Sequence, residues 1–223
     1  MGTGALAAAT GCYATAADLA AFYSALLPGQ HQLLGEDAQR QLRHRQWDVR
    51  GVESGYGLGV FLTRIGDREL FGHSGGFPGH ITRTLADPDS RVVVSALTNA
   101  IDGPAEPLAA GLFRLIDLAE SGSHQQAADA DRFVGRFGWL WGIQDVAALG
   151  GRLYALNPAL PNPADDAVPL ERIDDSTLKL VGGPGGGSFG ELMHFDFAAD
   201  GSINSVRGVS GMTMRPWQLP ALN

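Results

Sequence analysis

Short apolar runs separated by turn-forming residues occupy the chain from about residue 56 to residue 98, and they constrain the fold more than any other feature. The runs alternate in the manner of strands, with Gly66-Asp67 and an Asp-Pro-Asp-Ser stretch between them. This spacing predicts four antiparallel strands, over residues 57–64, 68–73, 80–86 and 91–97. The last run is almost entirely apolar, so we expect it to lie in the centre of the sheet.

Helical patterns flank this strand region on both sides. A Thr-x-x-Asp capping pattern at residues 15–18 precedes apolar residues at helical spacing, which predicts a helix over about 16–27. A more polar helix is predicted over 36–45, and a third, with proline in its first turn, over 104–118. Helices, then strands, then a helix predict an α+β unit.

The C-terminal part of the chain has a different pattern. Residues 121–130 are polar and lack a hydrophobic stripe, which predicts a linker. Residues 131–223 carry aromatic and β-branched clusters separated by Gly-Gly and Asp-Gly pairs, as in a small antiparallel barrel or sandwich. We therefore expect one domain over residues 1–120 and a second, a small antiparallel β-barrel, over 131–223.

The composition excludes several classes of function. With 44% hydrophobic and 18% charged residues, the chain of 223 residues has the make-up of a globular protein. Its net charge is −8 and its basic residues are thinly spread, so we expect no nucleic-acid partner. No run reaches the roughly 18 apolar residues that a membrane span requires. The apolar N-terminus has no basic segment, and we expect it to belong to the fold rather than to a signal peptide.

Cysteine and histidine offer no obvious reactive or metal site. Cys12 is the only cysteine, so it cannot form an intrachain disulfide, and no histidine or lysine lies near it in sequence to activate it. No two of the six histidines are spaced four residues apart, and His73 and His80 are separated by a Gly-Pro turn region. We therefore expect no metal and no other cofactor.

Two patterns imitate catalytic motifs. Ser176 and Lys179 satisfy the S-x-x-K pattern of serine acyl-transfer enzymes, whose chemistry needs the two side chains one helical turn apart. Their neighbours alternate as in a strand, which would place Ser176 and Lys179 on opposite faces. The glycine-rich run at 182–190 lacks the Lys-Ser/Thr of a phosphate loop and precedes a strand pattern, so we expect a hairpin connection there.

The stretch FGHSGGFPGH, residues 71–80, carries the strongest functional signal. A serine beside a histidine suggests a nucleophile and its base, whereas four glycines and a proline suggest only a tight hairpin. Strand-like residues lie on both sides of it. Glycines at the end of a strand let another backbone approach closely, and a free amide there can point at a developing oxyanion.

Several segments in this order resemble the C-terminal half of the serine β-lactamase and D,D-peptidase family, whose members are also called penicillin-binding-protein-like. They are ATGCYATAADLAAFYSALL, GYGLGV, GHSGGFPGH, DPDSRVVVSALTN and the helix from Pro104, which together cover about residues 5–118. GRFGWLWG, GGRLYAL and later segments are similar to the lipocalin-like β domain that often follows such enzymes. The resemblance implies a partial transpeptidase-like domain, an antiparallel sheet with helices, followed by the barrel.

In this family the third active-site motif is Lys-Thr-Gly or His-x-Gly, and His73, Ser74 and Gly75 match the latter. The resemblance implies that His73 sets the field and proton network, that Ser74 offers its hydroxyl to a substrate, and that the Gly76 amide forms half of the oxyanion hole. Gly76 and Phe77 would contact substrate, and Ser74 would not be the nucleophile. Because a histidine is only partly charged near neutral pH, it would anchor a substrate carboxylate less strongly than lysine.

The family's nucleophilic S-x-x-K and its Tyr-x-Asn or Tyr-x-Ser motif precede the region matched here, and neither tyrosine motif occurs in this sequence. One hypothesis is therefore that this chain is the C-terminal portion of a serine hydrolase. Such an enzyme would act on a small-molecule or peptide substrate, namely a β-lactam, an ester, or a D-amino-acid amide or peptide. We expect the chain to be inactive without its N-terminal half. Such a half domain would also be expected to self-associate. The alternative is a non-catalytic module whose barrel holds an apolar or peptide ligand against Trp139, Trp141 and Trp217, although aromatic residues in a small barrel are more often core residues.

Overall fold

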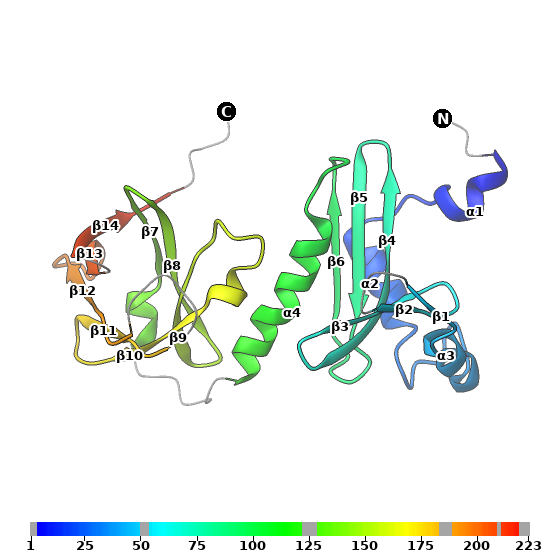
Figure 1. Cartoon of the computed structure of the whole chain (residues 1–223), viewed down its shortest axis with the longest axis horizontal. Coiled ribbons are helices and arrows are strands. Elements are labelled where there is room, and N and C mark those ends of the chain that lie inside the picture. The colour runs from blue at the N-terminus through cyan, green and yellow to red at the C-terminus, as the bar shows by residue number, and fades with distance from the viewer. Residues whose placement is uncertain (1–3, 50–53, 122–128, 183–188, 209–210, 219–223) are drawn as a thin grey trace. The chain divides into compact units, whose positions relative to one another are not determined.

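The computed structural model describes residues 4–49, 54–121, 129–182, 189–208 and 211–218. The chain divides into two compact units, Met1–Phe113 and Arg114–Asn223. Figure 1 shows helices beside a sheet in the first unit and a barrel in the second, so the predicted α+β class is confirmed. The helical elements are η1 (Gly4–Leu6), α1 (Ala7–Thr10), α2 (Ala16–Ser24), α3 (Glu36–Arg43), α4 (Ala105–Ser121), η2 (Ala130–Phe133) and η3 (Pro163–Asp166).

The predicted capping box starts α2. The backbone N–H of Asp18 donates to the Thr15 hydroxyl at 3.2 Å, and the Thr15 N–H donates to the Asp18 carboxylate at 2.9 Å. These contacts satisfy donors that the first helical turn leaves without partners. They also hold the pKa of Asp18 below its ordinary value, chiefly through the Thr15 backbone.

Six described strands of the first unit form an antiparallel sheet in simple sequence order. They are β1 (Trp47–Asp48), β2 (Ser54–Tyr56), β3 (Phe61–Ile65), β4 (Arg68–Phe77), β5 (His80–Ala86) and β6 (Val93–Thr98). The four predicted strands correspond to β3 through β6, but β4 runs four residues beyond its predicted end at His73 and so contains Ser74, Gly75, Gly76 and Phe77.

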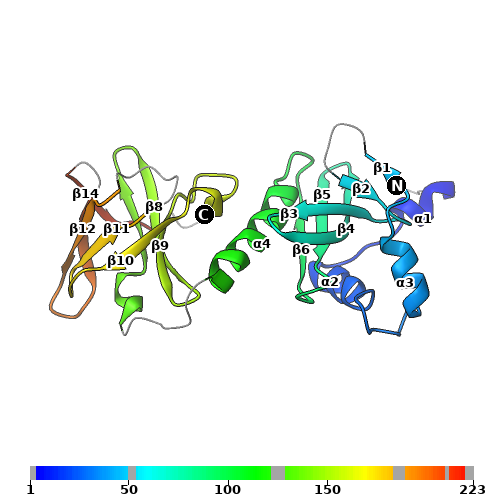
Figure 2. The same cartoon turned by 60° about the horizontal axis from the view of Figure 1, so that its bottom comes forward.

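The expectation that the last apolar run lies in the centre of the sheet was wrong. β6 is the terminal strand of the sheet within the described residues. β6 is apolar because helices cover both faces of the sheet. Val93 packs in a core cluster with Tyr23 and Leu26 of the α2 region, and Val94 packs in a different cluster with Phe113 of α4. The two helices lie on different sides of the strands (Figure 2).

The second unit contains a closed antiparallel barrel of eight described strands, in the order β10-β11-β12-β13-β14-β7-β8-β9. Its strands are β7 (Gly135–Trp139), β8 (Gly142–Leu149), β9 (Arg152–Leu156), β10 (Val168–Arg172), β11 (Thr177–Leu180), β12 (Leu192–Phe197), β13 (Ile203–Gly208) and β14 (Met212–Pro216). Its buried core includes Phe133, Phe137, Met193 and Phe195. The predicted barrel is thus confirmed, while its likeness to lipocalins and the domain limits stay predictions.

Two predicted connections fall largely on residues that the structure does not describe. Residues 122–128 of the predicted linker and residues 183–188 of the predicted glycine-rich hairpin lie outside the described residues. The strand expected after that hairpin is present as β12. None of the helices in the described part of the chain is long and apolar enough to cross a membrane.

Candidate functional site

The second half of β4 carries the predicted motif on an exposed hairpin. His73, Ser74, Gly75, Gly76 and Phe77 follow one another along the strand, and all but the partly buried His73 are exposed. A two-residue turn then leads into β5, so the tight-turn and strand interpretations of this stretch are both correct. Gly79, the second residue of this turn, has a φ of 84°, which glycine adopts without strain.

The register fixes which backbone groups of β4 are free. Phe77 pairs with His80 across the turn, so the odd-numbered residues of β4 direct their N–H and C=O groups to β5. β3 and β4 are joined by a similar turn at residues 66–67, so the even-numbered residues face β3. The pairing with β3 ends at Gly72. The amide of Gly76 therefore lies on an edge of β4 that no described strand covers.

Steric contacts separate the roles of the glycines. A Cβ on Gly72 would lie 1.9 Å from the carbonyl oxygen of Thr84, and one on Gly75 would lie 2.5 Å from the hydroxyl of Thr82. A Cβ on Gly76 would meet Ile81 at 3.6 Å, an ordinary contact. The close approach of β5 therefore explains Gly72 and Gly75. It does not explain Gly76.

Both ring nitrogens of His73 have partners. Nδ1 contacts the carbonyl oxygen of Ser74, and Nε2 lies 3.0 Å from the hydroxyl of Tyr56. A carbonyl only accepts hydrogen bonds, so Nδ1 carries a proton, and in the corresponding neutral tautomer Nε2 accepts from the tyrosine hydroxyl. Neither nitrogen is available to take a proton from the Ser74 hydroxyl. This arrangement argues against Ser74 and His73 as nucleophile and base.

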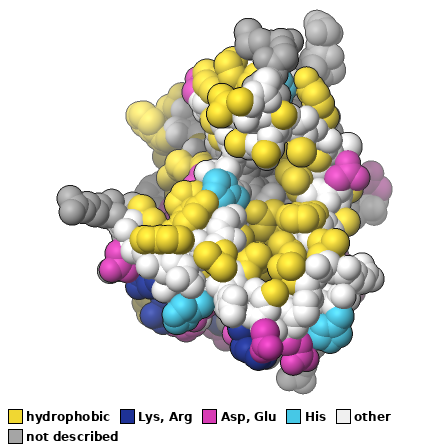
Figure 3. All heavy atoms as spheres, turned by 90° about the vertical axis from the view of Figure 1, so that its right-hand side faces the viewer, with side chains coloured by type: hydrophobic (Ala, Val, Ile, Leu, Met, Phe, Trp, Pro, Cys, Tyr) yellow, Lys and Arg dark blue, Asp and Glu magenta, His cyan; other side chains and the backbone are white. Residues whose placement is uncertain are grey.

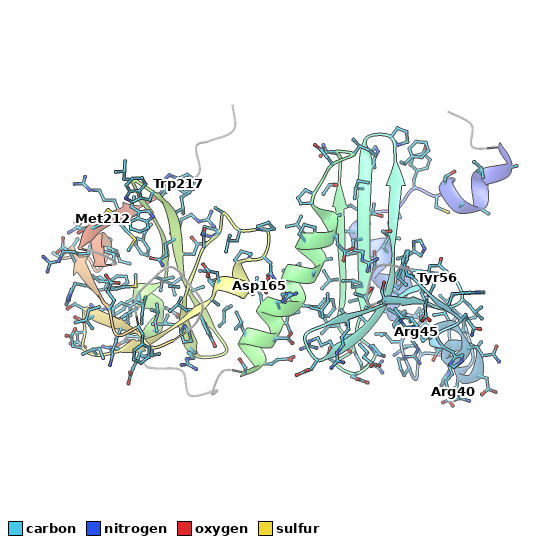
Figure 4. The ribbon with its side chains drawn as sticks, in the orientation of Figure 1. Arg40, Arg45, Tyr56, Asp165, Met212 and Trp217 are labelled. Carbon is cyan, nitrogen blue, oxygen red and sulfur yellow. The ribbon has the colours of Figure 1, made fainter. Side chains whose placement is uncertain are left out.

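Two aromatic rings, those of Phe61 and Tyr56, lie close to this histidine. The Phe61 ring centroid lies 4.9 Å from the His73 ring and 4.9 Å from the Tyr56 ring, and Trp47 lies 6.4 Å from Tyr56. Figure 4 labels Tyr56, which comes from the GYGLGV segment. The pattern of that segment predicted no site role for its tyrosine.

Arg83 is a second residue that sequence reasoning missed. It lies directly opposite Ser74 on β5. Its side chain is 6% exposed, its Nε is 2.7 Å from a carboxylate oxygen of Glu106, and its Nη2 donates to the Thr63 hydroxyl at 3.2 Å. The Nε–H is not aligned on any acceptor, so the contact with Glu106 is ionic rather than a well-formed hydrogen bond. Burial lowers the pKa of Arg83, and the charge of Glu106 raises it.

A hollow of about 380 Å³ lies beside Ser74, Arg83 and Glu106. Its lining consists of Ser54, Phe61, Thr63, Arg64, Ser74, Arg83 and Glu106. Three of these residues carry hydroxyl groups, and a guanidinium stays protonated at any ordinary pH. Hydroxyl donors around a fixed positive charge are suited to an oxyanion such as a carboxylate.

The remaining sequence candidates are placed elsewhere. Ser176 directly precedes β11 and donates its hydroxyl to Asp174 at 3.2 Å, while Lys179 lies on the strand itself, so the predicted strand is confirmed. A helical Ser-Lys pair is therefore absent at these two described residues. Cys12 is exposed. No group of three or more potential metal ligands occurs within the described ranges.

The tryptophans of the alternative hypothesis lie in different surroundings. Trp139 is partly buried against the barrel core, Trp141 is 73% exposed, and the Trp217 side chain packs beside Gly138. The first and last therefore have the contacts of packed residues, whereas Trp141 extends into solvent.

Comparison with known proteins identifies the first unit. The Beta-lactamase family model matches residues 1–120, and no curated protein matches the chain. Among solved structures, SurE with D-Leu is 21% identical, with a TM-score of 0.40 over 91% of this chain and 50% of that one. The octameric penicillin-binding protein homologue from Pyrococcus abyssi is 16% identical, with a TM-score of 0.44 over 89% and 46%.

A D-stereospecific amidohydrolase from Streptomyces sp. is 29% identical, with a TM-score of 0.35 over 38% of this chain and 25% of that one. The chain spans about half the length of the first two structures. The family match covers more than half of the chain, including the whole β3–β6 sheet and the His-Ser-Gly strand. This chain belongs to the Beta-lactamase family, a family of serine hydrolases.

Proposed function

We propose that the first unit forms one wall of a serine hydrolase site that cleaves β-lactams, esters or D-amino-acid amides through an acyl-enzyme. The observation that carries the proposal is the exposed end of β4. There the free Gly76 amide lies two residues from Ser74 along β4, and Ser74 pairs across the hairpin with the buried Arg83 of β5.

Each group has a distinct role in this proposal. The Gly76 N–H donates to the substrate carbonyl oxygen as negative charge develops on it, which is the work of an oxyanion hole. Ser74 donates its hydroxyl to a substrate carboxylate, and the Arg83 guanidinium, whose charge Glu106 partly balances, lies on the paired strand opposite Ser74. The expected substrate therefore carries a carboxylate near the bond that is cleaved.

His73 is a positioning group in this scheme. Its Nδ1–H holds the carbonyl of Ser74, so it fixes the backbone conformation just before the Gly76 amide. The hydrogen bond from Tyr56 keeps the ring in that tautomer.

The nucleophile must come from another segment. The only S-x-x-K of the sequence lies in and beside a strand, and no Tyr-x-Asn or Tyr-x-Ser occurs. We therefore propose that an N-terminal half not included in these residues supplies the nucleophile and its base. Exposed large side chains of the first unit support this, because Leu6, Tyr13 and Trp47 are 66%, 100% and 58% exposed. Figure 3 shows hydrophobic side chains gathered on one face, as expected of a surface that a partner segment covers.

Two experiments test the proposal. N-acetyl-D-alanine and its neutral amide are titrated against the ¹⁵N-labelled chain, and the acid alone should shift the Ser74 and Gly76 amide resonances. Ser74→Ala should weaken that binding, while Ser202→Ala in the barrel should not. Equal shifts from acid and amide would contradict the role of Arg83.

The second experiment is incubation with a labelled penicillin followed by mass spectrometry. We expect no stable adduct on this chain. A stable adduct on Ser74 or Ser176 would overturn the assignment of the nucleophile to another segment.

The ligand-binding alternative for the barrel stays a prediction. The core of the described barrel consists of its own buried side chains, such as Phe137 and Met193. No specific observation in the described residues favours a ligand there, so we do not propose it as a second function.

A further inference from the structure

A second hollow, about 830 Å³ in volume, lies beside α3, and four of its twelve lining residues are arginines. Its charged or titratable lining residues are Arg40, Arg43, His44, Arg45, Arg64 and Glu69. Glu69 is the only acidic member of this lining among the described residues. Figure 4 labels Arg40 and Arg45 in this region of the first unit. The hollow therefore presents a concentration of guanidinium groups on a chain whose net charge is −8.

The rest of the lining is partly apolar. Leu62, Leu70 and Phe71 contribute to it, and the guanidinium carbon of Arg43 lies 5.6 Å from the centroid of the Phe71 ring. This distance is within the range of a cation–π contact. A site that combines arginines with aromatic and aliphatic side chains is suited to a ligand that has both an anionic group and an apolar group.

Three of the arginines have acidic neighbours that lie in solvent. Arg40, Arg45 and Arg64 pair with carboxylates three or four residues away, whose side chains are 66% to 107% exposed. Exposed pairs of this kind contribute little to stability and are screened by salt. A bound anion can therefore engage these guanidinium groups without breaking a buried ion pair.

Arg43 differs from the other three. Its Nε donates to the carbonyl oxygen of Gln39 at 3.2 Å, and no carboxylate of the described residues lies within ion-pairing distance of it. Burial lowers the pKa of Arg43, and the charge of Asp89 raises it. A partly buried guanidinium that no carboxylate of the described residues contacts directly favours an incoming oxyanion, which it can hold with two parallel hydrogen bonds.

We propose that this hollow is a second binding site, for a small amphiphilic oxyanion in which a phosphate or carboxylate is attached to an aromatic or aliphatic group. Arg43 and Arg45 hold the oxyanion, and Leu62 and Phe71 contact the apolar group. The site is distinct from the Ser74 hollow, although Thr63 and Arg64 line both.

The test uses phenyl phosphate as the probe, with inorganic phosphate and benzyl alcohol as matched ligands that lack the ring or the charge. Calorimetric titration of the full chain at low ionic strength should show phenyl phosphate binding about tenfold more tightly than inorganic phosphate, because a buried ring adds to the charge-assisted contacts. Benzyl alcohol should not bind measurably. Equal affinity for both phosphates, or no heat from phenyl phosphate at millimolar concentration, would overturn the proposal.

Variants locate the site. Arg43→Gln should weaken phenyl phosphate binding about tenfold, as expected for the loss of a charge-assisted hydrogen bond, and Arg45→Gln should weaken it to a smaller extent. Arg207→Gln on the exposed surface of β13 changes the net charge equally and should leave the affinity within about twofold. An equal loss in Arg207→Gln would show non-specific charge attraction and refute the site.

Folding of the variants is checked independently by circular dichroism. If Arg43→Gln does not fold, the wild-type chain still gives a result. The ¹⁵N resonances of Gly55, Leu62 and Phe71 should shift with phenyl phosphate, whereas those of Ser74 and Gly76 should not. Shifts confined to Ser74 and Gly76 would assign the anion to the other hollow and overturn the proposal.

Discussion

The carboxylate of Asp87 offers the sharpest test of what stabilises the first unit. Asp87 is 2% exposed and accepts hydrogen bonds from Arg68 Nη1 at 2.6 Å, from the Ser90 hydroxyl at 2.7 Å and from the Asp89 N–H at 2.9 Å. In Asp87→Asn the amide oxygen can still accept from Asp89, and the amide nitrogen can donate to the Ser90 hydroxyl oxygen, but it faces Arg68, which only donates. The residue thus keeps its shape and loses the charge and its hydrogen bond with Arg68.

The expected cost follows from these contacts. Hydrogen bonds to a charged group contribute about 1.5–3 kcal/mol, and breaking a buried pair costs about 3–5 kcal/mol. Arg68 retains a little solvent contact, with its side chain 12% exposed, so we expect about 2–3 kcal/mol of lost unfolding free energy. Amide hydrogen exchange in β5 and β6 should accelerate roughly 30- to 150-fold at neutral pH. The barrel amides are the internal control and should not change.

The effect should depend on pH with a definite sign. Burial by itself raises the pKa of Asp87, but the hydrogen bonds from Ser90, Arg68 and the Asp89 amide outweigh it, and the net shift is downward. A lowered pKa in the folded state contributes stability above the unfolded value, about 3.9, and this stability is lost as the pH falls through the folded value. The difference between wild type and Asp87→Asn should therefore shrink below about pH 4.

A matched substitution completes this experiment. Asp67→Asn changes a carboxylate whose side chain is fully exposed, so exchange in β5 and β6 should stay near the wild-type rate. Two results would refute the assignment of this stability to the buried carboxylate. One is a wild-type rate of amide exchange in Asp87→Asn at neutral pH. The other is a difference in exchange rate between wild type and Asp87→Asn that is as large at pH 3 as at neutral pH.

Three further predictions concern the site and the helix that packs beneath it. Tyr56→Phe should leave the circular dichroism spectrum unchanged but shift the ¹⁵N resonance of His73 Nε2, and an unmoved resonance would show that the hydrogen bond does not form in solution. Gly72→Ala should lower the melting temperature by several degrees because its Cβ would meet a backbone oxygen at 1.9 Å, whereas Gly76→Ala should change it little, and the reverse order would contradict the observed strand register. Thr15→Ala should cost about 1 kcal/mol in urea unfolding through loss of the capping box, and a value near zero would show that the cap is not needed.

Local patterns were sufficient for most elements of the first unit. The capping box at Thr15 and the turn at Pro78-Gly79 act over three or four residues, so their residues specify them directly. The position of β6 was not accessible in this way. An apolar run indicates that both faces of a strand are buried, but it does not say where in the sheet the strand lies. In this sheet α2 and α4 bury the two faces of β6, which is a terminal strand.

The site was partly predictable for a similar reason. Once the two-residue turn between Phe77 and His80 is accepted, counting outward places Ser74 opposite Arg83, so a signal for the arginine was present. No comparable count leads to Glu106 or Tyr56, because a helix and a separate hairpin bring them to the strand.

The sequence by itself determined the strand and helix periods, the hairpin and the resemblance through His73, Ser74 and Gly75, because these depend on the order of neighbouring residues. Tertiary structure alone decided which groups those residues meet. The pairing of β3 with β4 ends at Gly72 and leaves the Gly76 amide uncovered, and α4 brings Glu106 within 2.7 Å of Arg83. Such contacts depend on sheet register and helix packing, which act between segments distant in sequence and cannot be read from any one of them.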